Sequence, residues 1–479
     1  MVAGCGGGNA VVDTSPSGAP TPTQDTAPPI TSDTGPGTMS HPIVVYWSID
    51  TLSAPVATTI DLCARVQQTL APAGLDVGCY DGAVPPSSRT LESHLRTLWP
   101  DRAVEGHRHE IAPPCDEVGT LGLLVDAFGA AYVVAPDNPH FTFPGDAILC
   151  DGEVSWFAGA DASFGYDEGS VVAVVEEADR PVARGLDALE AAIADGQAAV
   201  ALFNDYEAGG HTPRCFFAPQ SAACTALWAF AVDEGLVDPD ADPAEAWTDA
   251  LLWNLLLGRL GALDDVALDA FRPGLLDTIV EQSDYFAEER LLPRLARLVD
   301  AVVAAGRQAD LVLVLAGDHG ENPCVTLPFG SGVQCSHGGA PTDWTGRVPV
   351  LVAPAEVGDA WRQAGLVGDG DQAWALGNVS HGLVHTFGLP TPDHWPDPEP
   401  LGSATSWACA DSVDVLGGIR VEGDTALRCV EESCGAFRWA TPTSALDTAE
   451  PVEDVPSGLL AYGDPNGPGD NWFTAACAD

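Results

Sequence analysis

A short apolar run that ends in an acid and a histidine constrains this chain more than any other feature. Residues 311–316 read LVLVLA, and Gly317, Asp318, His319 and Gly320 follow directly. Such a run, bounded by turn residues, is typical of a strand buried on both faces of a parallel sheet. Open α/β sheets bind ligands at the carboxyl ends of these strands, and a carboxylate beside an imidazole suits a divalent cation. The sequence therefore predicts a metal site, although the same residues also fit an ordinary turn with an Asp cap.

A second apolar run ends in the same way near the start of the chain. Residues 42–50 read PIVVYWSID, a β-branched and aromatic stretch closed by Asp50. Because the carboxyl ends of neighbouring parallel strands lie at one edge of a sheet, we expect Asp50 and Asp318 to converge on one cation. The competing interpretation is that Asp50 caps the helix that follows.

The charge balance excludes several classes of function. The 479 residues carry 19 basic and 69 acidic side chains, a formal net charge of −50. A chain with this charge repels nucleic acid and anionic lipid surfaces, so nucleic-acid binding is excluded as a main function. Every basic residue is an arginine, and without lysine the chain has no Schiff-base or catalytic ammonium chemistry.

The cysteines indicate an oxidising compartment. All 13 are spread along the chain rather than grouped as Cys-x-x-Cys pairs, which argues against a zinc ribbon. Setting Cys5 aside leaves 12, an even number that fits disulfides. A bond between Cys324 and Cys335 would close a short loop just beyond Asp318.

Cys5 itself ends the stretch Val2-Ala3-Gly4-Cys5, which resembles the lipobox of bacterial lipoproteins. The resemblance implies a lipid anchor on Cys5 and a protein of the cell envelope or the extracellular space. Residues 6–37 are rich in Gly, Pro, Ser, Thr and Asp and cannot bury a core, so we expect disorder until about residue 41. No run of about 18 or more apolar residues occurs, and no membrane-spanning helix is predicted.

Hydroxyl side chains crowd the entry to a helix that is predicted to begin near Thr90. Residues 84–95 read VPPSSRTLESHL, downstream of an amphipathic helix expected within residues 61–75. A hydroxyl at a helix N-terminus faces unpaired backbone N–H groups and the positive end of the helix dipole, which favours attack on a phosphate or sulfate. The plainer interpretation makes Thr90 the helix N-cap with Ser93 at the third helical position, and both can hold together.

Three segments, in this order and spacing, resemble the sulfatase and alkaline phosphatase superfamily. They read Ser-Ile-Asp-Thr-Leu at 48–52, Thr-Leu-Glu-Ser-His at 90–94 and Gly-Asp-His-Gly-Glu at 317–321. The middle segment is similar to the Thr-Leu-Pro-Ser-His nucleophile segment of sulfatase-like hydrolases, with Glu92 in place of the proline. Further segments that agree with the family lie at residues 120–134, 164–167, 198–213, 283–305, 335–339, 347–351 and 379–389.

The resemblance implies an α/β fold, the alkaline-phosphatase-like three-layer sandwich with a mostly parallel central sheet, plus a small C-terminal antiparallel α+β subdomain. We expect a lipobox remnant and linker over residues 1–40, a catalytic domain over 41–400, and the small subdomain with a surface wrap over 401–479. Residues 225–275 are rich in Leu, Ala and Asp and have a helical period, which favours a helical insertion.

For the site, the resemblance implies a divalent metal, Zn, Mn, Ca or Mg. Its ligands would be Asp50, Asp318 and His319, with the Thr90 oxygen as the fourth. Metal coordination would lower the pKa of the Thr90 hydroxyl, which is otherwise a poor nucleophile. Thr90 would then attack phosphorus or sulfur in line and form a covalent ester that water later cleaves.

Four more residues complete the predicted site. By the resemblance, His211 and His337 bind the substrate's oxygens or protonate the leaving group, and Arg89 adds a bidentate clamp. Glu207 lies four residues before His211, the spacing of the second metal site in two-metal phosphodiesterases of the superfamily, which His337 would complete. The family places Asp where this chain has Glu207, so one metal and two metals both stay open.

The function implied is a hydrolase of phosphate, phosphodiester, phosphonate or sulfate esters, acting on a small-molecule, glycan or lipid ester. Phosphoryl-type esters are favoured, because the Cys-x-Pro-x-Arg maturation motif is absent at Thr90 and the chain has no lysine to bind sulfate. The alternative is a catalytically inactive cell-surface lipoprotein of the same fold that acts in binding. Glu92 and the replaced Asp and Pro of the segment 379–389 keep this alternative open.

Overall fold

In the computed structural model, all the described residues belong to the unit Gly37–Asp479. The described residues are 39–88, 93–94, 97–100, 119–137, 154–156, 180–205, 215, 219–247, 250–326, 333–335, 342, 344–370, 372–409, 416–423, 425–430 and 433–438.

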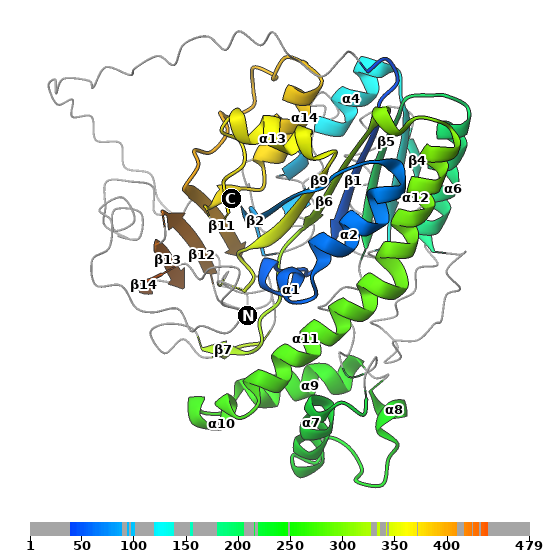
Figure 1. Ribbon diagram of the computed structural model, residues 1–479. Coiled ribbons are helices and arrows are strands. Elements are labelled where there is room, and N and C mark those ends of the chain that lie inside the picture. The colour runs from blue at the N-terminus through cyan, green and yellow to red at the C-terminus, as the bar shows by residue number, and fades with distance from the viewer. Residues whose placement is uncertain are drawn as a thin grey trace, which may run out of the picture. The chain divides into compact units, whose positions relative to one another are not determined.

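The unit is built around an eight-stranded sheet of order β10-β2-β9-β6-β1-β5-β3-β4. The strands are β1 Ile43–Ile49, β2 Gly78–Val84, β3 Ala131–Pro136, β4 Val154–Trp156, β5 Ala199–Asp205, β6 Leu311–Gly317, β9 Val348–Ala353 and β10 Trp374–Ala375. β9 pairs antiparallel with β6 and with β2, and all the other pairings are parallel. This is the mostly parallel sheet that the sequence predicts (Figure 1).

The two strands predicted from their apolar runs lie side by side at the centre. β1 and β6 are buried along their whole length, as is β5 on the other side of β1. Along β1 the side chains of Ile43, Val45 and Trp47 join one apolar cluster, and those of Val44 and Tyr46 join another. This alternation with helices on both faces explains why the strands read as continuous apolar runs.

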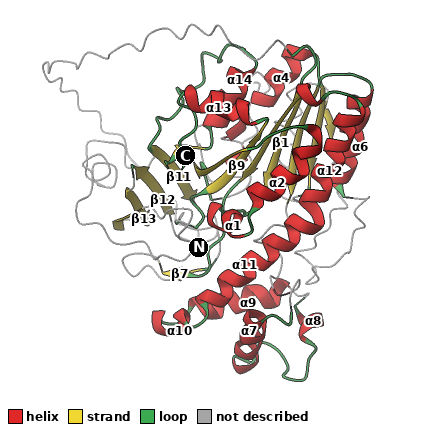
Figure 2. Ribbon diagram, in the orientation of Figure 1, coloured by secondary structure: helices red, strands yellow, loops and turns green. Residues whose placement is uncertain are grey.

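Helices cover both faces and complete three layers (Figures 1 and 2). The cluster on one face includes residues of α1 Ala54–Thr59, α2 Leu62–Leu70, α6 Pro181–Ala194 and α12 Leu292–Ala304. The cluster on the other face includes residues of α4 Thr120–Phe128, α13 Ala355–Gln363 and α14 Asn378–Thr386. The α/β sandwich of the alkaline-phosphatase type is thus confirmed.

Two of the expected helices are interrupted. The helix expected within residues 61–75 stops at Leu70, and the 3₁₀ turn η1 Ala71–Ala73 continues it. Pro72 has no N–H to donate, which tightens the last turn in this way. The helix expected over residues 283–305 comprises the end of α11 Arg272–Phe286, the π turn η5 Ala287–Leu291 and α12.

Two smaller parts extend the sandwich. One part is a group of helices that precede α11 and share an apolar cluster with Trp247 and Trp253. Its helices are α7 Ala222–Asp233, α8 Pro243–Ala246, α9 Ala250–Gly261 and α10 Asp265–Asp269. The four strands of the C-terminal antiparallel sheet are β11 Ser403–Cys409, β12 Leu416–Glu422, β13 Thr425–Val430 and β14 Ser433–Arg438. The remaining elements are the 3₁₀ turn η6 Gln308–Asp310 and the hairpin of β7 Val325–Thr326 with β8 Val333–Gln334.

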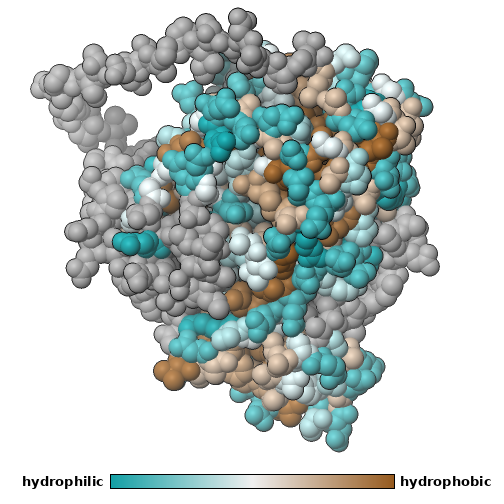
Figure 3. Space-filling view, viewed as in Figure 1, coloured by the Kyte–Doolittle hydropathy of each residue, from teal (hydrophilic) through white to brown (hydrophobic). Residues whose placement is uncertain are grey.

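The described surface on the side of α2 and α12 is mainly hydrophilic, with small scattered apolar areas (Figure 3). This pattern is ordinary for a soluble face, since single exposed apolar side chains are common. No described helix is long and apolar enough to cross a membrane.

Candidate metal centre

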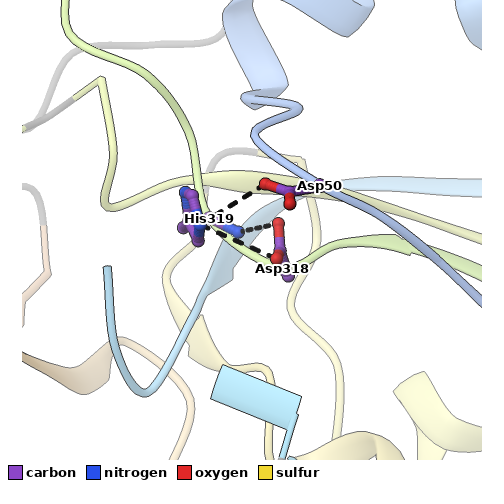
Figure 4. Close-up of side chains that lie close together, drawn as sticks. All are labelled: Asp50, Asp318 and His319. Atoms are coloured by element: carbon purple, nitrogen blue, oxygen red, sulfur yellow. Dashed lines mark hydrogen bonds and ion pairs between the residues drawn. The ribbon is translucent and has the colours of Figure 1, made fainter. Parts of the chain in front are cut away.

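Strand register alone brings the two predicted carboxylates together. Ile49 of β1 pairs with Gly317 of β6, so Asp50 and Asp318 leave neighbouring parallel strands at the same level. His319 follows, and all three side chains are almost fully buried, with at most 1% of their surface exposed. Figure 4 shows the two carboxylates and the imidazole pointing toward one another.

The spacing of the three side chains suits a cation. His319 Nε2 lies 3.7 Å from Asp50 Oδ1 and 3.7 Å from Asp318 Oδ2. One ligand atom from each residue falls within 4.8 Å of the others. Ligands bound tetrahedrally at roughly 2.1 Å from an ion are about 3.4 Å apart, so a small closure would bring these atoms to coordination distance.

The hydrogen bonds of Asp318 leave one oxygen for an ion. Asp318 Oδ1 accepts from the backbone N–H of Thr51 at 2.9 Å and from that of His319 at 2.8 Å. Asp318 Oδ2 is buried and has no hydrogen-bond partner among the described residues. A buried carboxylate oxygen is costly without a partner, and a cation between Asp50, Asp318 and His319 would supply one. The turn interpretation of Asp318 therefore holds for Oδ1, and Oδ2 is the oxygen that could bind an ion.

His319 is held in the orientation of a ligand. Its Nδ1 lies 3.0 Å from the carbonyl oxygen of Gly320, which can only accept a hydrogen bond. The proton therefore sits on Nδ1, and Nε2 presents its lone pair toward Asp50 and Asp318. A backbone carbonyl that fixes the tautomer in this way is the usual companion of a metal-bound histidine.

The close approach of loop backbones requires glycine on either side of the ligand pair. A Cβ on Gly317 would lie 2.2 Å from the carbonyl oxygen of Leu52, and one on Gly320 would lie 1.9 Å from that of Trp344. Thr51, between Asp50 and Leu52, has φ 60, a strained value for a β-branched residue. The N-cap of α1 is Ser53, whose side chain accepts from Val56 N, so the competing interpretation of Asp50 as the helix cap does not hold.

Behind Asp318 lies the helix that follows the predicted nucleophile. Ser93, His94, Thr97 and Leu98 are its described helical residues. Ser93 Oγ donates to the Asp318 carbonyl oxygen at 2.6 Å, and His94 Nε2 lies 3.9 Å from Asp318 Oδ2. Burial lowers the pKa of His94 to about 4, with Asp318 opposing the shift, so the imidazole is neutral at pH 7. The helix is therefore anchored to the backbone and side chain of a metal-ligand candidate.

Five predicted site residues lie outside the described residues, namely Arg89, Thr90, Glu207, His211 and His337. Of their described neighbours in sequence, Ser93 and Asp205 contact residues of the centre. Ser88 and Ser93, which flank Thr90, are buried. Asp205, two residues before Glu207, ends β5 and accepts the backbone N–H of Asp50 at 2.8 Å through its own carbonyl. Cys335, two residues before His337, is bonded to Cys324.

Sequence reasoning missed a buried ion network at the same edge of the sheet. Arg294 of α12 bonds to Asp205 and, at 3.2 Å, to Asp137 at the end of β3. Asp205 also accepts from Trp47 Nε1 at 2.6 Å, and Asp137 accepts from Val182 N at 3.1 Å. The network joins the ends of β1, β3 and β5 to two helices. A sequence gives no signal for it beyond an acid at each strand end.

Three disulfides connect described cysteines, Cys63–Cys79, Cys215–Cys224 and Cys324–Cys335. The Cys324–Cys335 bond closes the short loop beyond Asp318 that the sequence allows, although the sequence alone does not give the pairing. The three bonds indicate an oxidising, extracytoplasmic environment. Two of them, Cys215–Cys224 and Cys324–Cys335, lie in the apolar cluster of the helices α7 to α11.

A cavity of about 170 Å³ is lined by described residues outside the metal centre. Its walls include Val84, Pro86 and Pro100, which flank the predicted nucleophile segment in sequence, and His381 and Asn378 of α14. His381 is only 7% exposed and stacks edge-on against Trp395. Asp50, Asp318 and His319 do not line this cavity.

Comparison with known proteins finds solved structures of similar fold. No family model matches the chain, and no curated protein matches it in sequence. Among solved structures, it is similar to the phosphonate monoester hydrolase of Agrobacterium radiobacter, with TM-score 0.50 and 11% identity over 85% of this chain and 91% of that one. It also matches the lipoteichoic acid synthase LtaP of Listeria monocytogenes, with TM-score 0.47 and 11% identity over 92% and 91% of the two chains.

A third match is an alkaline phosphatase superfamily protein of Vibrio parahaemolyticus, with TM-score 0.46 and 11% identity over 88% of this chain and 84% of that one. Likeness at such identity shows the fold alone, because unrelated activities share folds. The buried Asp50, Asp318 and His319 group is one that could bind a metal. The chain has an alkaline-phosphatase-like α/β fold, which it shares with the phosphonate monoester hydrolase.

Proposed function

We propose that this chain is a metal-dependent hydrolase of phosphoryl-type esters that acts through a covalent intermediate on Thr90. The observation that carries the proposal is the buried Asp318 Oδ2, which has no hydrogen-bond partner among the described residues and faces Asp50 and His319. Two carboxylates buried side by side carry a large desolvation cost and repel each other, and a cation bound between them would offset both.

The donor set decides which ion fits. Two carboxylate oxygens and one imidazole nitrogen suit Zn or Mn best, and Ca or Mg less well, because the last two prefer oxygen ligands. Such an ion, when bound, lowers the pKa of a coordinated hydroxyl and compensates charge that develops on a transferred group. The Thr90 oxygen is the proposed fourth ligand, since the helix after Thr90 carries Ser93 and His94 at Asp318.

In the proposed reaction the Thr90 hydroxyl loses its proton to water, and Oγ1 forms a bond to phosphorus as the bond to the leaving oxygen breaks. The leaving oxygen takes a proton from His211 or His337, and Arg89 holds the non-bridging oxygens of the substrate. Water then cleaves the covalent ester and restores the Thr90 hydroxyl. Alternatively, Glu207, His211 and His337 hold a second ion instead of acting as acids, and this ion would add positive charge where a phosphate mono- or diester carries its negative charge.

Phosphoryl-type esters are proposed over sulfate esters because residue 90 is threonine and the chain has no lysine. The fold likeness to a phosphonate monoester hydrolase agrees with this choice, although the likeness concerns the fold. The proposed substrate is an ester of a small molecule, a glycan or a lipid. A lipid anchor on Cys5 would hold the enzyme at the cell envelope, in line with the disulfides.

One assay series tests the proposal. The chain is stripped of metal, reloaded with Zn, Mn, Ca or Mg, and given aryl phosphate, bis-aryl phosphate, aryl phosphonate and aryl sulfate esters. We expect metal-dependent turnover of the phosphoryl-type esters that Thr90→Ala abolishes and Thr90→Ser partly retains. A quenched reaction should carry the substrate's phosphoryl group on the peptide that contains Thr90.

Unchanged turnover in Thr90→Ala would rule out the nucleophile. No turnover of any ester with any ion would instead favour the inactive, binding lipoprotein of the same fold. For the second site, the bound ions are counted in the wild type and in Glu207→Ala, and equal counts would remove that site.

A further inference from the structure

The cavity at the N-terminal end of α14 contains a buried histidine that lacks a hydrogen bond. His381 lines this cavity, is 7% exposed, and forms no hydrogen bond with any described residue. Its ring packs edge-on against that of Trp395, with the centroids 5.5 Å apart. Buried polar side chains are normally paired with a polar group, a water molecule or a ligand. The cavity is therefore a candidate binding site.

One wall of the cavity is held firmly by Asn378. This side chain is 2% exposed, and its Nδ2 donates to the carbonyl oxygens of Leu366 and Glu399, each at 3.0 Å. Its Oδ1 accepts from the Glu399 backbone N–H at 3.0 Å. These bonds hold the segment 396–399, in which two of the four residues are proline, against the first turn of α14. Because proline has little backbone freedom, the wall has its shape before a ligand binds.

The size and surface of the cavity limit the ligand to a small, partly apolar group. A cavity of about 150 Å³ holds a benzene molecule, so the volume of about 170 Å³ suits roughly six heavy atoms. Val84 of β2 and Ala375 of β10 contribute apolar surface. Four prolines add to it, namely Pro86, Pro100, Pro396 and Pro398. A short alkyl chain with one polar end would match these walls.

The polar groups of the cavity favour a cation. Asp397 and Glu399 line it, and none of the described residues that line it is an arginine. Burial lowers the pKa of His381, and Asp397 opposes this shift only in part, so the ring is neutral at pH 7. No partner fixes the ring proton, so the nitrogen that faces the cavity can present its lone pair. A carboxylate and a neutral imidazole both accept hydrogen bonds, as an ammonium group requires.

An anion is the competing ligand, because the N-terminus of a helix attracts negative charge. Gly377, the N-cap of α14, lines the cavity. The backbone N–H groups of Val379 and Ser380, however, already donate to backbone carbonyls. Asn378 has used both N–H groups of its side chain. The two carboxylates at the cavity would also repel an anion.

We propose that this cavity binds a small primary alkylammonium group, which donates to His381 and to Asp397 while its alkyl part packs against the prolines. A quaternary ammonium group fits less well, because it has no N–H to donate to the imidazole. The proposed ligand therefore combines one ammonium group with a chain of about four carbons.

The site is separate from the metal centre. Val84 and Ala375 pair with each other and end β2 and β10, which run parallel to β6, so the cavity lies on the carboxyl edge of the sheet. β2 and β10 are two and three strands from β6, about 10 and 14 Å along that edge. One small alkylammonium ion cannot span this distance. The inference therefore stands without the proposed function.

The first test is a titration of the wild-type chain with four matched probes in 0.15 M NaCl, which screens the acidic surface. The probes are butylammonium, butanol, butyrate and butyltrimethylammonium. We expect butylammonium to bind with a Kd of the order of 1–10 mM, and the other three to bind at least tenfold more weakly. The ring nitrogen resonances of His381, assigned by their loss in His381→Gln, should shift along the same binding curve.

The second test locates the site with variants, measured by calorimetry. His381→Phe should weaken butylammonium binding at least tenfold, and His381→Gln, which keeps an acceptor, by less. Asp397→Asn should weaken it about threefold or more. Asp393→Asn removes the same charge four residues earlier, from an exposed side chain that does not line the cavity, and should leave Kd unchanged. Asp397 is exposed, so its variant tests the site even if His381→Phe fails to fold.

The inference is overturned if butylammonium binds the wild type no better than butanol, butyrate or butyltrimethylammonium does. It is also overturned if Asp397→Asn weakens binding no more than Asp393→Asn does, because the ammonium group would then bind the acidic surface elsewhere. Failure of the proposed function would appear in the ester assays and would leave both of these results as they are.

Discussion

Asp50 and Asp318 leave neighbouring parallel strands at one rung of the sheet and meet at the imidazole of His319. Ile49 pairs with Gly317, and the next residue of each strand supplies a carboxylate that lies 3.7 Å from His319 Nε2. These contacts depend on close packing of the loop backbones and on the buried ion network at the same edge of the sheet. Each of these supports can be tested.

Gly320→Ala should disrupt the centre by steric clash. The added Cβ would lie 1.9 Å from the Trp344 carbonyl oxygen, a backbone atom that cannot rotate away. We expect a loss of at least about 2 kcal/mol in the free energy of unfolding, together with weaker metal binding. The control is Gly258→Ala in α9, where the Cβ meets nothing within 4 Å. That change should stabilise the chain by about 0.5–1 kcal/mol, as measured by denaturant unfolding. Equal effects of the two changes would contradict the account.

Arg294→Met should be far more damaging than Arg297→Met, although both lie on α12. Arg294 is buried between Asp137 and Asp205, and removing it leaves two buried carboxylates without their cation, at about 3–5 kcal/mol. Arg297 pairs with Asp187 and Glu190 at the surface, where a pair contributes about 1 kcal/mol or less. Denaturant midpoints at pH 7 compare the two. A similar loss in both variants would show that the network does not support the edge of the sheet.

His381 should make the free energy of unfolding decrease as the pH is lowered. Burial lowers the pKa of His381, and Asp397 opposes the shift only in part. Above the unfolded pKa of about 6.5 the ring is neutral in both states and its full contribution is present. As the pH falls below that value, the unfolded chain takes up a proton that the folded chain resists, so the free energy of unfolding decreases.

The comparison is with His381→Gln, measured from pH 7.5 to pH 5. Because the other titrating groups are shared, the wild type should lose stability more steeply than the variant below about pH 6.5. Parallel curves would mean that His381 titrates as it does in the unfolded chain.

The Cys324–Cys335 disulfide should matter to activity as well as to stability. It and Cys63–Cys79 close loops of similar size, with separations of 11 and 16, so losing either should cost about 3 kcal/mol. The Cys324 carbonyl accepts from Arg272 Nε at 3.0 Å, and Cys335 lies two residues before His337. The double variant Cys324→Ser, Cys335→Ser should therefore lower kcat, and Cys63→Ser, Cys79→Ser should not. Equal kcat in the two double variants would contradict a role for the loop.

The sequence predicted the site best where a buried apolar run is followed directly by a possible metal ligand. The apolar runs that became β1 and β6 each end in an acid, and parallel pairing then fixes Asp50 beside Asp318. The helix cap could not be assigned in this way, because Asp50 and Ser53 are both good N-cap residues and only the start of α1 at Ala54 decides between them. The sequence of one strand end fits both an ordinary turn and a metal site. In the structure Asp318 Oδ1 accepts the backbone hydrogen bonds of the turn, and Oδ2 has no hydrogen-bond partner among the described residues.

Contacts between distant segments could not be predicted. His94 meets Ser48 and Asn204 across 46 and 110 residues, and Arg294 meets Asp205 across 89. These contacts depend on which strands are neighbours in the sheet, and no local pattern records that order. His94 belongs to the Thr-Leu-Glu-Ser-His segment, but its contacts with Ser48 and Asn204 follow only from the three-dimensional arrangement.

The central claim is that Asp50, Asp318 and His319 hold a divalent cation. It is tested most directly by counting the ions that each chain retains after equilibrium dialysis against Zn, in the wild type, in Asp318→Asn and in Asp187→Asn, which changes an exposed carboxylate. The account predicts one ion fewer per chain in Asp318→Asn than in the other two. The same number of bound ions in all three chains would contradict it.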